Sequence, residues 1–493
     1  MLQGYVFQGI SISKILSLGT GENMSDHKKK SDGFLIKMLE GMLYVGFVVI
    51  GFYLAFLIRF DMNPAVVNSE PFYENIPYMV LLSIVVFYLY DIVSTIKKSL
   101  FENAIIIVLS LAIIDILMMA IVFFNRGFAF PRSVFFIGFL VQFILIFVFK
   151  IIVLTILKHK RKTQGIMIIA PTKEAEYIAK KILLDKFNFD KVRFIVDKIN
   201  NETYKLIEQV EKVYIGNEIN EQDKLNLIKY CSDRNKTLYI VPGLFEIALI
   251  NSKVTQVKDM LVFKVEGMGL TFEQTVVKRF MDIFISLVGL IVLLPFLIII
   301  ALGIKLSDRG PVFYKQKRVT KNNRIFNLYK FRTMVVNAEK GLGPVMASEN
   351  DLRITPLGKL LRTFRIDEIP QLINVIKGEM SIVGPRPERP FFVKKLNEEM
   401  EEFKYRVLVK AGITGLAQIL GKYSTTPESK IKYDLLYIRN YSLLLDIKII
   451  FNTIKIMFIK DSSKGIAKVR ELEEIFKELD LNVYKEYGAT RIE

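Results

Sequence analysis

The sequence predicts a membrane protein of the α plus α/β class, with a four-helix transmembrane bundle, a small doubly wound α/β domain and a third module that contains a further membrane helix. Three observations support this class. Four long apolar stretches fill the first third of the chain, short apolar runs then alternate with charged helical segments from residue 165, and a fifth apolar stretch occupies residues 280–304. A hydrophobic share of 52% beside 24% charged residues requires apolar residues to be segregated into membrane segments.

The composition excludes several kinds of site. A length of 493 residues allows two or three domains. The net charge of +18 raises the question of nucleic acid, but no signature of a nucleic-acid-binding module is visible, and in a membrane protein such a charge indicates a face that lies against anionic lipid. The single cysteine, Cys231, excludes an intramolecular disulfide and a cysteine zinc cluster. His27 and His159 lie in basic runs beside membrane segments, so we expect neither a histidine triad nor a histidine metal site.

The first third of the chain predicts membrane helices. Residues 1–32 are polar and predict a disordered cytoplasmic tail, and residues 33–162 hold the four apolar stretches, at 41–60, 78–93, 104–124 and 134–157. Basic runs at 28–30, 97–98 and 158–162 alternate with loops poor in lysine, so the positive-inside rule places both ends of this set in the cytoplasm. Asp91 and Asp115 lie in or beside these stretches and are either functional or ordinary helix-end and bundle-interior residues.

Residues 163–268 predict a small Rossmann-like α/β domain. The apolar runs 166–170, 192–196, 212–216 and 237–241 predict parallel strands, with crossover helices near 174–184 and 221–231. A dinucleotide site needs glycines after the first strand, because the backbone must approach the pyrophosphate closely. Here that turn is Ala170-Pro171-Thr172-Lys173, so we do not expect a working nucleotide site.

The fifth apolar stretch has the length of a membrane span but carries Pro295 near its middle, where the missing N–H and the ring bend or break a helix. Both flanks are basic, with Lys278 and Arg279 on the N-terminal side. Two positive flanks favour a re-entrant helix whose ends both stay in the cytoplasm. The alternative is an ordinary kinked crossing, because proline is common in membrane helices. Ser286 is too far from Pro295 to satisfy the backbone groups at the break.

The stretch from Pro356 to Pro387 contains the acid pair Asp367-Glu368, shortly before Pro370. Because proline is tolerated in the first turn of a helix, we expect a helix from about Asp367 to about Gly378. Its start carries unpaired N–H groups and the positive end of the macrodipole, which would keep a carboxylate ionised and favour a phosphate nearby. Such a carboxylate can attack phosphorus or hold a divalent metal; the alternative is that Asp367 is simply an N-cap.

Several cations accompany this pair in the sequence. Arg362 precedes it, and Arg386 follows it in a rigid turn, Gly384-Pro385-Arg386-Pro387. Upstream, Lys330 and Arg332 are two residues apart on a probable strand and so share a face. Alone, such a face is often simply solvated; beside the two arginines it becomes a candidate cradle for a diphosphate. The other candidate members of this cradle, on the preceding probable strand, are Gln316 and Arg318.

These segments resemble the catalytic module of the bacterial polyprenyl-phosphate phosphoglycosyl transferases of the large monotopic type. This is the bacterial sugar transferase, or exopolysaccharide polyprenyl glycosylphosphotransferase, family. The resemblance covers a module at residues 269–460 and rests on the segments KRFMDIFISLVGLIVLLP, YKFRTM, VGPRP and GITGLAQ. Larger members carry four membrane helices and a nucleotide-binding-like domain ahead of the module, and the whole chain is similar to those. Ala411 departs from the family pattern, which usually has proline there.

The resemblance implies a transferase reaction in two stages. Asp367 would attack the sugar-proximal phosphate of a nucleoside-diphosphate sugar, with uridine as the expected base, and release the nucleoside monophosphate. Polyprenyl (undecaprenyl) phosphate, presented by the re-entrant helix, would then take the phosphosugar from the aspartyl ester. Mg²⁺ would be held by Asp367 and Glu368, and Arg362 and Arg386 would neutralise phosphoryl charge. Asp446 matches a family acid that would orient an active-site arginine, although an N-cap role is open as well.

The same resemblance implies a location in the cell and a biological role. The chain would be a multi-pass protein of the bacterial inner membrane, with the module on the cytoplasmic face against anionic lipid, and it would initiate exopolysaccharide, capsule or O-antigen repeat units. The resemblance also allows a homodimer. Two alternatives remain, a nucleotide-sugar dehydratase-like enzyme built on the α/β domain and an inactive membrane scaffold for polysaccharide assembly. For the C-terminal tail, residues 461–493, only an amphipathic stretch near 469–479 is predicted.

Overall fold

The computed structural model describes residues 24–62, 66–93, 98–125, 130–185, 188–336, 338, 351–421, 425–459, 471–486 and 489–492. The chain divides into two compact units, Met1–His159 and Lys160–Glu493, and each is described by itself.

The first unit consists of long apolar helices, α2 (Met24–Arg59), α3 (Val66–Leu89), α4 (Leu100–Phe124) and α5 (Arg132–Lys160). With α10 (Phe272–Asp308) of the second unit, they are the helices of the described chain that are long and apolar enough to cross a membrane. The predicted membrane α plus α/β class is therefore confirmed. Helix α2 begins at Met24, so residues 24–32 are helical where a disordered tail was expected, while residues 1–23 lie outside the described part.

Polar side chains are buried between these helices. Lys150 Nζ donates to Glu40 Oε1 at 2.8 Å and to the Ile92 carbonyl at 2.9 Å, and it is 1% exposed. Asp115 is buried in the interior, whereas Asp91 is exposed at the end of α3 with a φ of 48°. Asp115 thus lies in the interior of the helix bundle and Asp91 at a helix end.

The second unit begins with a parallel sheet. Strands β1 (Gly165–Ile169), β2 (Lys191–Val196), β3 (Lys212–Ile215) and β4 (Thr237–Ile240) pair in the order β2-β1-β3-β4, which confirms the four predicted strands. Helices α6 (Thr172–Leu183), α7 (Asn201–Glu208) and α8 (Glu221–Asp233) connect them, and α9 (Leu244–Leu249) follows β4. Each face of the sheet carries its own hydrophobic cluster, and the central strand β1, which is buried along its length, contributes to both.

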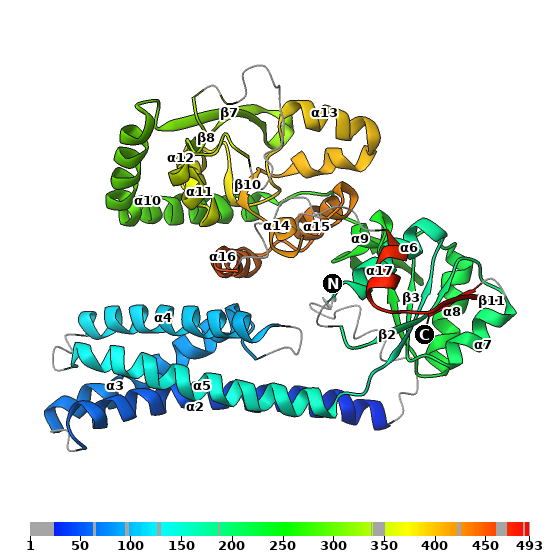
Figure 1. Ribbon diagram of the computed structural model, residues 1–493, viewed down its shortest axis with the longest axis horizontal. Helices are drawn as coiled ribbons and strands as arrows, with labels where there is room; N and C mark the ends of the chain where they lie inside the picture. Colours follow the sequence, from blue (N-terminus) through cyan, green and yellow to red (C-terminus); the bar gives the residue numbers. More distant parts are fainter. Residues whose placement is uncertain are drawn as a thin grey trace. The chain divides into compact units, whose positions relative to one another are not determined.

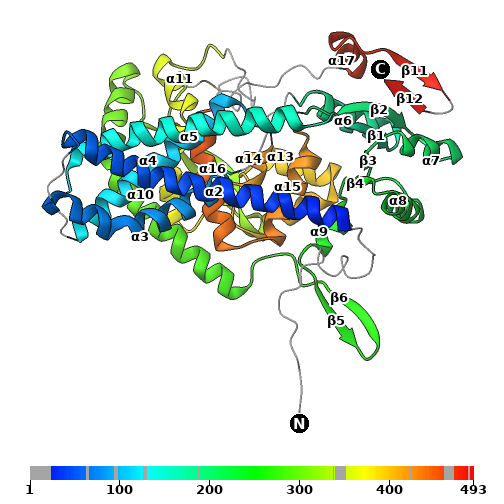
Figure 2. The same cartoon turned by 90° about the horizontal axis from the view of Figure 1, so that it is seen from below.

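The C-terminal residues complete this sheet. Strand β12 (Ala489–Ile492) pairs antiparallel with β2, and β11 (Val483–Glu486) pairs with β12, so the sheet has six strands (Figure 2). Helix α17 (Leu472–Glu478) packs on α6, with Ile475 and Phe476 buried. The segment expected to be a tail thus covers the β2 edge, which would otherwise expose unpaired backbone groups.

The crevice where a doubly wound sheet binds nucleotides is filled by a side chain. The strand order reverses between β1 and β3, and ligands bind such sheets at that switch point. There the Glu174 carboxylate accepts hydrogen bonds from the backbone N–H groups of Asn217 (2.7 Å) and Glu218 (3.2 Å). A Cβ on Gly216 would lie 2.3 Å from Glu174 Oε2, so the carboxylate lies directly against the strand end.

The remainder of the second unit is built around α10 and short elements. The hairpin β5 (Lys253–Val257) and β6 (Met260–Lys264) precedes α10, and the hairpin β7 (Phe313–Val319) and β8 (Ile325–Phe331) follows it, with η1 (Lys321–Asn323) at its turn. Next come α11 (Pro356–Thr363), η2 (Ile366–Glu368), α12 (Gln371–Lys377) and β9 (Ser381–Val383). The C-terminal elements are α13 (Pro390–Glu399), η3 (Glu401–Leu408), β10 (Gly412–Thr414), α14 (Leu416–Leu420), α15 (Pro427–Arg439) and α16 (Leu443–Met457).

Helix α10 turns sharply partway along its length (Figure 1). Straight, its 37 residues would extend for about 55 Å. Instead both halves contact the same group of short elements: Asp282 in the first half bonds to β9, and Ile304 near the end packs with Phe331 and Leu361. Most of its other apolar side chains are exposed, among them Phe280, Phe284, Leu287, Ile291, Leu294 and Ile298.

Candidate active site

The acid pair lies in the 3₁₀ turn η2, between α11 and α12. Arg365, directly before this turn, has a φ of 53°, a left-handed conformation that is costly for a residue with a Cβ and that occurs preferentially at functional sites. Asp367 is 8% exposed and caps no helix, because the N-cap positions belong to Arg365 for η2 and Pro370 for α12. The predicted helix start at Asp367 is wrong, because the acid pair lies in η2 and α12 begins at Gln371. The predicted end is confirmed, since Gly378 closes α12 with a φ of 80°.

Lys330 is the cation nearest to both acids. From β8 its Nζ donates to Glu368 Oε1 at 2.7 Å and lies 3.9 Å from Asp367 Oδ2. Its side chain is 20% exposed, so this is a partly desolvated cluster and not a solvated strand face. The structure therefore brings together the strand and the acid pair that the sequence pattern linked.

Two arginines flank the pair, and a neutral oxygen holds each of them. Arg386 Nη2 donates to Glu368 Oε1 at 3.3 Å, and its Nη1 donates to Gln418 Oε1 at 2.9 Å. Arg362 Nε donates to Thr333 Oγ1 at 2.8 Å. The neutral Thr333 hydroxyl leaves Arg362 its full charge, so Arg362 can still neutralise an anion that reaches Asp367, whereas Arg386 shares its charge with Glu368.

The two carboxylates have opposite pKa shifts. Burial raises the pKa of Asp367, and the Glu368 charge adds to this, while Lys330 and Arg362 oppose it. Burial would raise the pKa of Glu368 as well, but Lys330 and Arg386 hold it well below its usual range. The pKa of Asp367 is thus shifted opposite to the direction expected for a carboxylate at a helix start, because burial is the largest cause, whereas the neighbouring cations favour charge on Glu368.

Gln316 and Arg318 stabilise the Gly384–Pro387 turn. The Arg318 guanidinium donates to Gln316 Oε1 from Nε (3.0 Å) and Nη2 (2.6 Å), and from Nη1 to the Pro387 carbonyl (2.9 Å). Burial lowers the pKa of Arg318 to about 10, so it stays charged at neutral pH. The Arg332 guanidinium lies against Gly310, where a Cβ would be 1.8 Å from its Nη1.

The basic residues before the fifth apolar stretch hold α10 against the rest of the unit. Lys278 forms a buried ion pair with Asp446, which also accepts from the Tyr437 hydroxyl at 2.8 Å. Arg279 donates to the carbonyls of Val375 and Ile376 at the C-terminal end of α12.

Asp446 thus pairs with a lysine and not with the arginine that the resemblance implied. It is not an N-cap either, because Ser442 caps α16. Ser286 is fully buried, and its Oγ lacks a hydrogen-bond partner within the described residues.

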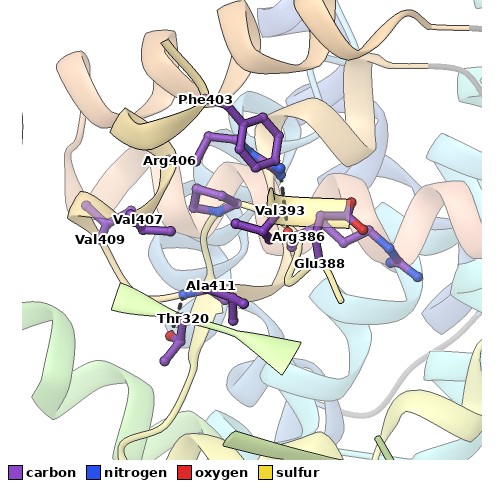
Figure 3. A pocket seen from close by; sticks show the side chains of 11 residues that line it. Thr320, Arg386, Glu388, Val393, Phe403, Arg406, Val407, Val409 and Ala411 are labelled. Atoms are coloured by element: carbon purple, nitrogen blue, oxygen red, sulfur yellow. Dashed lines mark hydrogen bonds between the residues drawn. The ribbon is translucent and has the colours of Figure 1, made fainter. Parts of the chain in front are cut away.

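A small pocket lies behind the Gly384–Pro387 turn (Figure 3). Its walls are apolar at Val393 and Phe403, and Thr320 closes it next to Ala411. Arg406 Nη2 donates to the Arg386 carbonyl at 3.2 Å, and its Nε bonds to the buried Asp434 at 2.6 Å. Figure 3 shows the Arg386 side chain extending away from this apolar lining. Arg406, which lines the pocket, therefore holds the backbone of Arg386, while the Arg386 guanidinium contacts the acid pair.

Several side chains that hold the site were not predicted from sequence. Gln418 and Thr333 hold the flanking arginines, and Asp282 Oδ1 accepts from Ser381 Oγ (3.0 Å) and the Ile382 N–H (2.9 Å). Each lies within a motif quoted above, in GITGLAQ, YKFRTM and KRFMD. For Gln418 and Asp282 a signal was therefore available, since a polar residue in an otherwise apolar run often has a buried partner.

The acid pair also fits a divalent metal. Mg²⁺ usually takes one or two carboxylates together with substrate phosphates and water. Asp367 and Glu368 supply two carboxylates, and Glu368 Oε1 is occupied by Lys330 and Arg386, which leaves its second oxygen and the Asp367 oxygens. The described residues contain no cluster of three or more acidic, histidine or cysteine side chains, so substrate and water would complete any coordination shell.

Comparison with known proteins identifies the family. The profile of the family described as bacterial sugar transferase matches residues 273–460. The exopolysaccharide production protein PSS of Rhizobium leguminosarum bv. phaseoli is 42% identical over 187 residues, which cover 36% of this chain and 94% of that protein. The chain belongs to the bacterial sugar transferase family. The resemblance inferred from the motifs is therefore confirmed, and the acid pair with its cations lies inside the matched region.

Longer relatives match over part of their own length. The UDP-N-acetylgalactosamine-undecaprenyl-phosphate N-acetylgalactosaminephosphotransferase of Aeromonas hydrophila is 43% identical over 182 residues, 36% of this chain and 43% of that protein. The UDP-glucose:undecaprenyl-phosphate glucose-1-phosphate transferase of Xanthomonas campestris pv. campestris is 38% identical over 253 residues, 50% of this chain and 52% of that protein. The chain spans about half the length of these curated relatives.

Proposed function

We propose that this protein transfers a phosphosugar from a UDP-sugar to a polyprenyl phosphate and releases UMP. The observation that carries the proposal is the buried Asp367, next to Lys330 and between two arginines, within the region that matches the bacterial sugar transferase family. The relatives named for UDP-sugars and undecaprenyl phosphate support the choice of donor and acceptor.

Asp367 is the proposed nucleophile. Its carboxylate oxygen attacks the sugar-proximal phosphorus, a P–O bond forms to Asp367, and the bond to the leaving UMP breaks. A phosphate oxygen of the lipid then attacks the same phosphorus, the bond to Asp367 breaks, and a polyprenyl diphosphosugar forms. Glu368 is less suited to attack, because one of its oxygens already accepts from Lys330 and Arg386.

The cations around Asp367 stabilise the charge that develops on the phosphoryl oxygens. Lys330, Arg362 and Arg386 are held in place before substrate arrives, so little reorganisation is needed when that charge develops. Asp367 and Glu368 are the proposed ligands of Mg²⁺, which when bound would neutralise part of the diphosphate charge. The raised pKa of Asp367 implies that activity rises with pH as this carboxyl ionises.

The proposed membrane arrangement has the four helices of the first unit as spans and α10 as a re-entrant helix. Its exposed apolar side chains require a nonpolar surrounding, and the contacts of both its halves with one group of elements support a helix that returns to the side it came from. In this arrangement the acid pair stays on the cytoplasmic face of the bacterial inner membrane, where UDP-sugars and the lipid phosphate meet. The product would begin a repeat unit of a surface polysaccharide.

The test uses the full chain in lipid nanodiscs with undecaprenyl phosphate and a panel of UDP-sugars, with UMP release as the readout. We expect release with at least one UDP-sugar that depends on the lipid, and its loss in Asp367→Asn. Asp233→Asn, which changes an exposed carboxylate on α8, is the matched control and should retain wild-type rates. Lipid-dependent release that survives Asp367→Asn would overturn the assignment.

A further inference from the structure

The amide of Gln418 is oriented by Arg386. Because a guanidinium can only donate, Gln418 must turn its oxygen toward Arg386 Nη1, at 2.9 Å, and its nitrogen away. That nitrogen is buried and has no hydrogen-bond partner in the described part of the chain. The Gln418 amide thus leaves its buried NH₂ group without a hydrogen bond while its oxygen contacts Arg386. Leaving a buried donor unpaired costs free energy, and packing alone does not explain that cost.

The backbone fixes the separation of these two side chains. Gln418 lies on α14, directly after β10, and Arg386 lies in the turn directly after β9. Gly384 N donates to the Thr414 carbonyl at 2.8 Å, and Gly412 N donates to the Pro385 carbonyl at 2.9 Å. Gly415 approaches so closely that a Cβ there would lie 2.2 Å from the Gly384 carbonyl oxygen. These contacts hold the start of α14 beside the turn of Arg386.

The neutral Gln418 contact differs from the carboxylate contacts of two structural arginines in the unit. Arg406 pairs with Asp434 at 2.6 Å and Arg353 pairs with Asp351 at 2.5 Å, so carboxylates balance these two structural guanidinium groups. Arg386 already faces one carboxylate, Glu368. A second carboxylate in the place of Gln418 would cancel the positive charge that a phosphate group needs.

We propose that Gln418 is a positioning residue that holds Arg386 toward the donor diphosphate without neutralising it. This inference rests on the proposed function. It makes two separable claims: the acceptor oxygen of residue 418 sets the direction of the guanidinium, and the absence of charge on residue 418 preserves the affinity for phosphate.

Two substitutions of similar length separate these claims. Gln418→Glu keeps the acceptor and adds a charge, and Gln418→Met removes the acceptor and adds none. We expect either variant to lower kcat/KM for the UDP-sugar by about tenfold or more, mainly through KM for Gln418→Glu. We also expect Gln418→Glu to weaken the binding of UDP itself, measured by calorimetry on the full chain in nanodiscs, by a similar factor.

Gln222, exposed on α8, provides the matched controls Gln222→Glu and Gln222→Met, which should behave as wild type. A purely structural role for Gln418 would lower the unfolding temperature but leave KM and UDP affinity of the folded protein unchanged, and that result would overturn the inference. So would wild-type UDP affinity in Gln418→Glu. UDP binding is measured without turnover, so a wild type that binds UDP but transfers no phosphosugar contradicts the proposed function alone.

Discussion

Removal of the Lys330 charge should shift the pH dependence of the reaction. Lys330 Nζ lies 3.9 Å from Asp367 Oδ2. At an effective dielectric constant of about 20, two unit charges at this distance attract by about 4 kcal/mol, which corresponds to roughly 3 pKa units. Water that enters the space left by the lysine, together with the remaining arginines, replaces part of this lost stabilisation of the Asp367 carboxylate. We therefore expect the pKa of Asp367 to rise by roughly 1–2 units in Lys330→Met, further above a value that burial already raises.

The assay is kcat/KM for UMP release as a function of pH, which reports ionisations of the free enzyme. Because Asp367 must lose its proton to attack, the rate rises with pH through its pKa, and the acid limb should move to higher pH in Lys330→Met. The position of this limb does not depend on how much protein is folded. Lys359→Met, an exposed lysine on α11, is the control and should keep the wild-type profile. An acid limb that stays in place in Lys330→Met would refute the assignment of Lys330 as the partner of Asp367.

Three further predictions concern the supports of the site. Thr333→Val should release Arg362 and lower kcat/KM about tenfold, whereas Thr333→Ser should retain activity; equal rates in both would contradict the role of the hydroxyl. Asp446→Ala leaves the buried Lys278 without its partner and should destabilise the second unit by about 3–5 kcal/mol, measured by denaturant unfolding in detergent, and a shift below about 1 kcal/mol would argue against a buried pair. Deletion of residues 471–493 uncovers the β2 edge, so limited proteolysis should cut within residues 160–240 faster than in the full chain, and unchanged cleavage would contradict the pairing of β12.

Local patterns were sufficient to predict many elements of this protein. The four parallel strands follow from short apolar runs between polar segments, a pattern that holds both for β1, which is buried along its length, and for β4, which is largely exposed. The end of α12 at Gly378 follows from the conformational freedom of glycine at a positive φ. Lys330 could be linked to the acid pair because closely spaced cations and acids are both typical of sites that bind phosphate, although β8 and η2 are far apart in sequence.

The remaining features depend on contacts that no local pattern encodes. Asp446 lies one helical turn after Ser442, the N-cap of α16, and its partner Lys278 lies on α10. Sequence spacing therefore could not show that Asp446 pairs with this lysine and not with an arginine. The order in which Asp367 and Glu368 ionise depends on burial and on which oxygen meets Lys330 and Arg386. Strands β11 and β12 are short and polar in part, and only their pairing with β2 makes them strands.

The most direct test of the account is to trap the proposed ester. The full chain in nanodiscs without polyprenyl phosphate is mixed with a UDP-sugar, quenched in acid and digested, and the peptides are measured by mass spectrometry. The account predicts the mass of a phosphosugar on the peptide that contains Asp367, its absence in Asp367→Asn, and its loss when polyprenyl phosphate is added before the quench. A phosphosugar on a different residue, or lipid-dependent turnover in which no protein adduct forms, would contradict it.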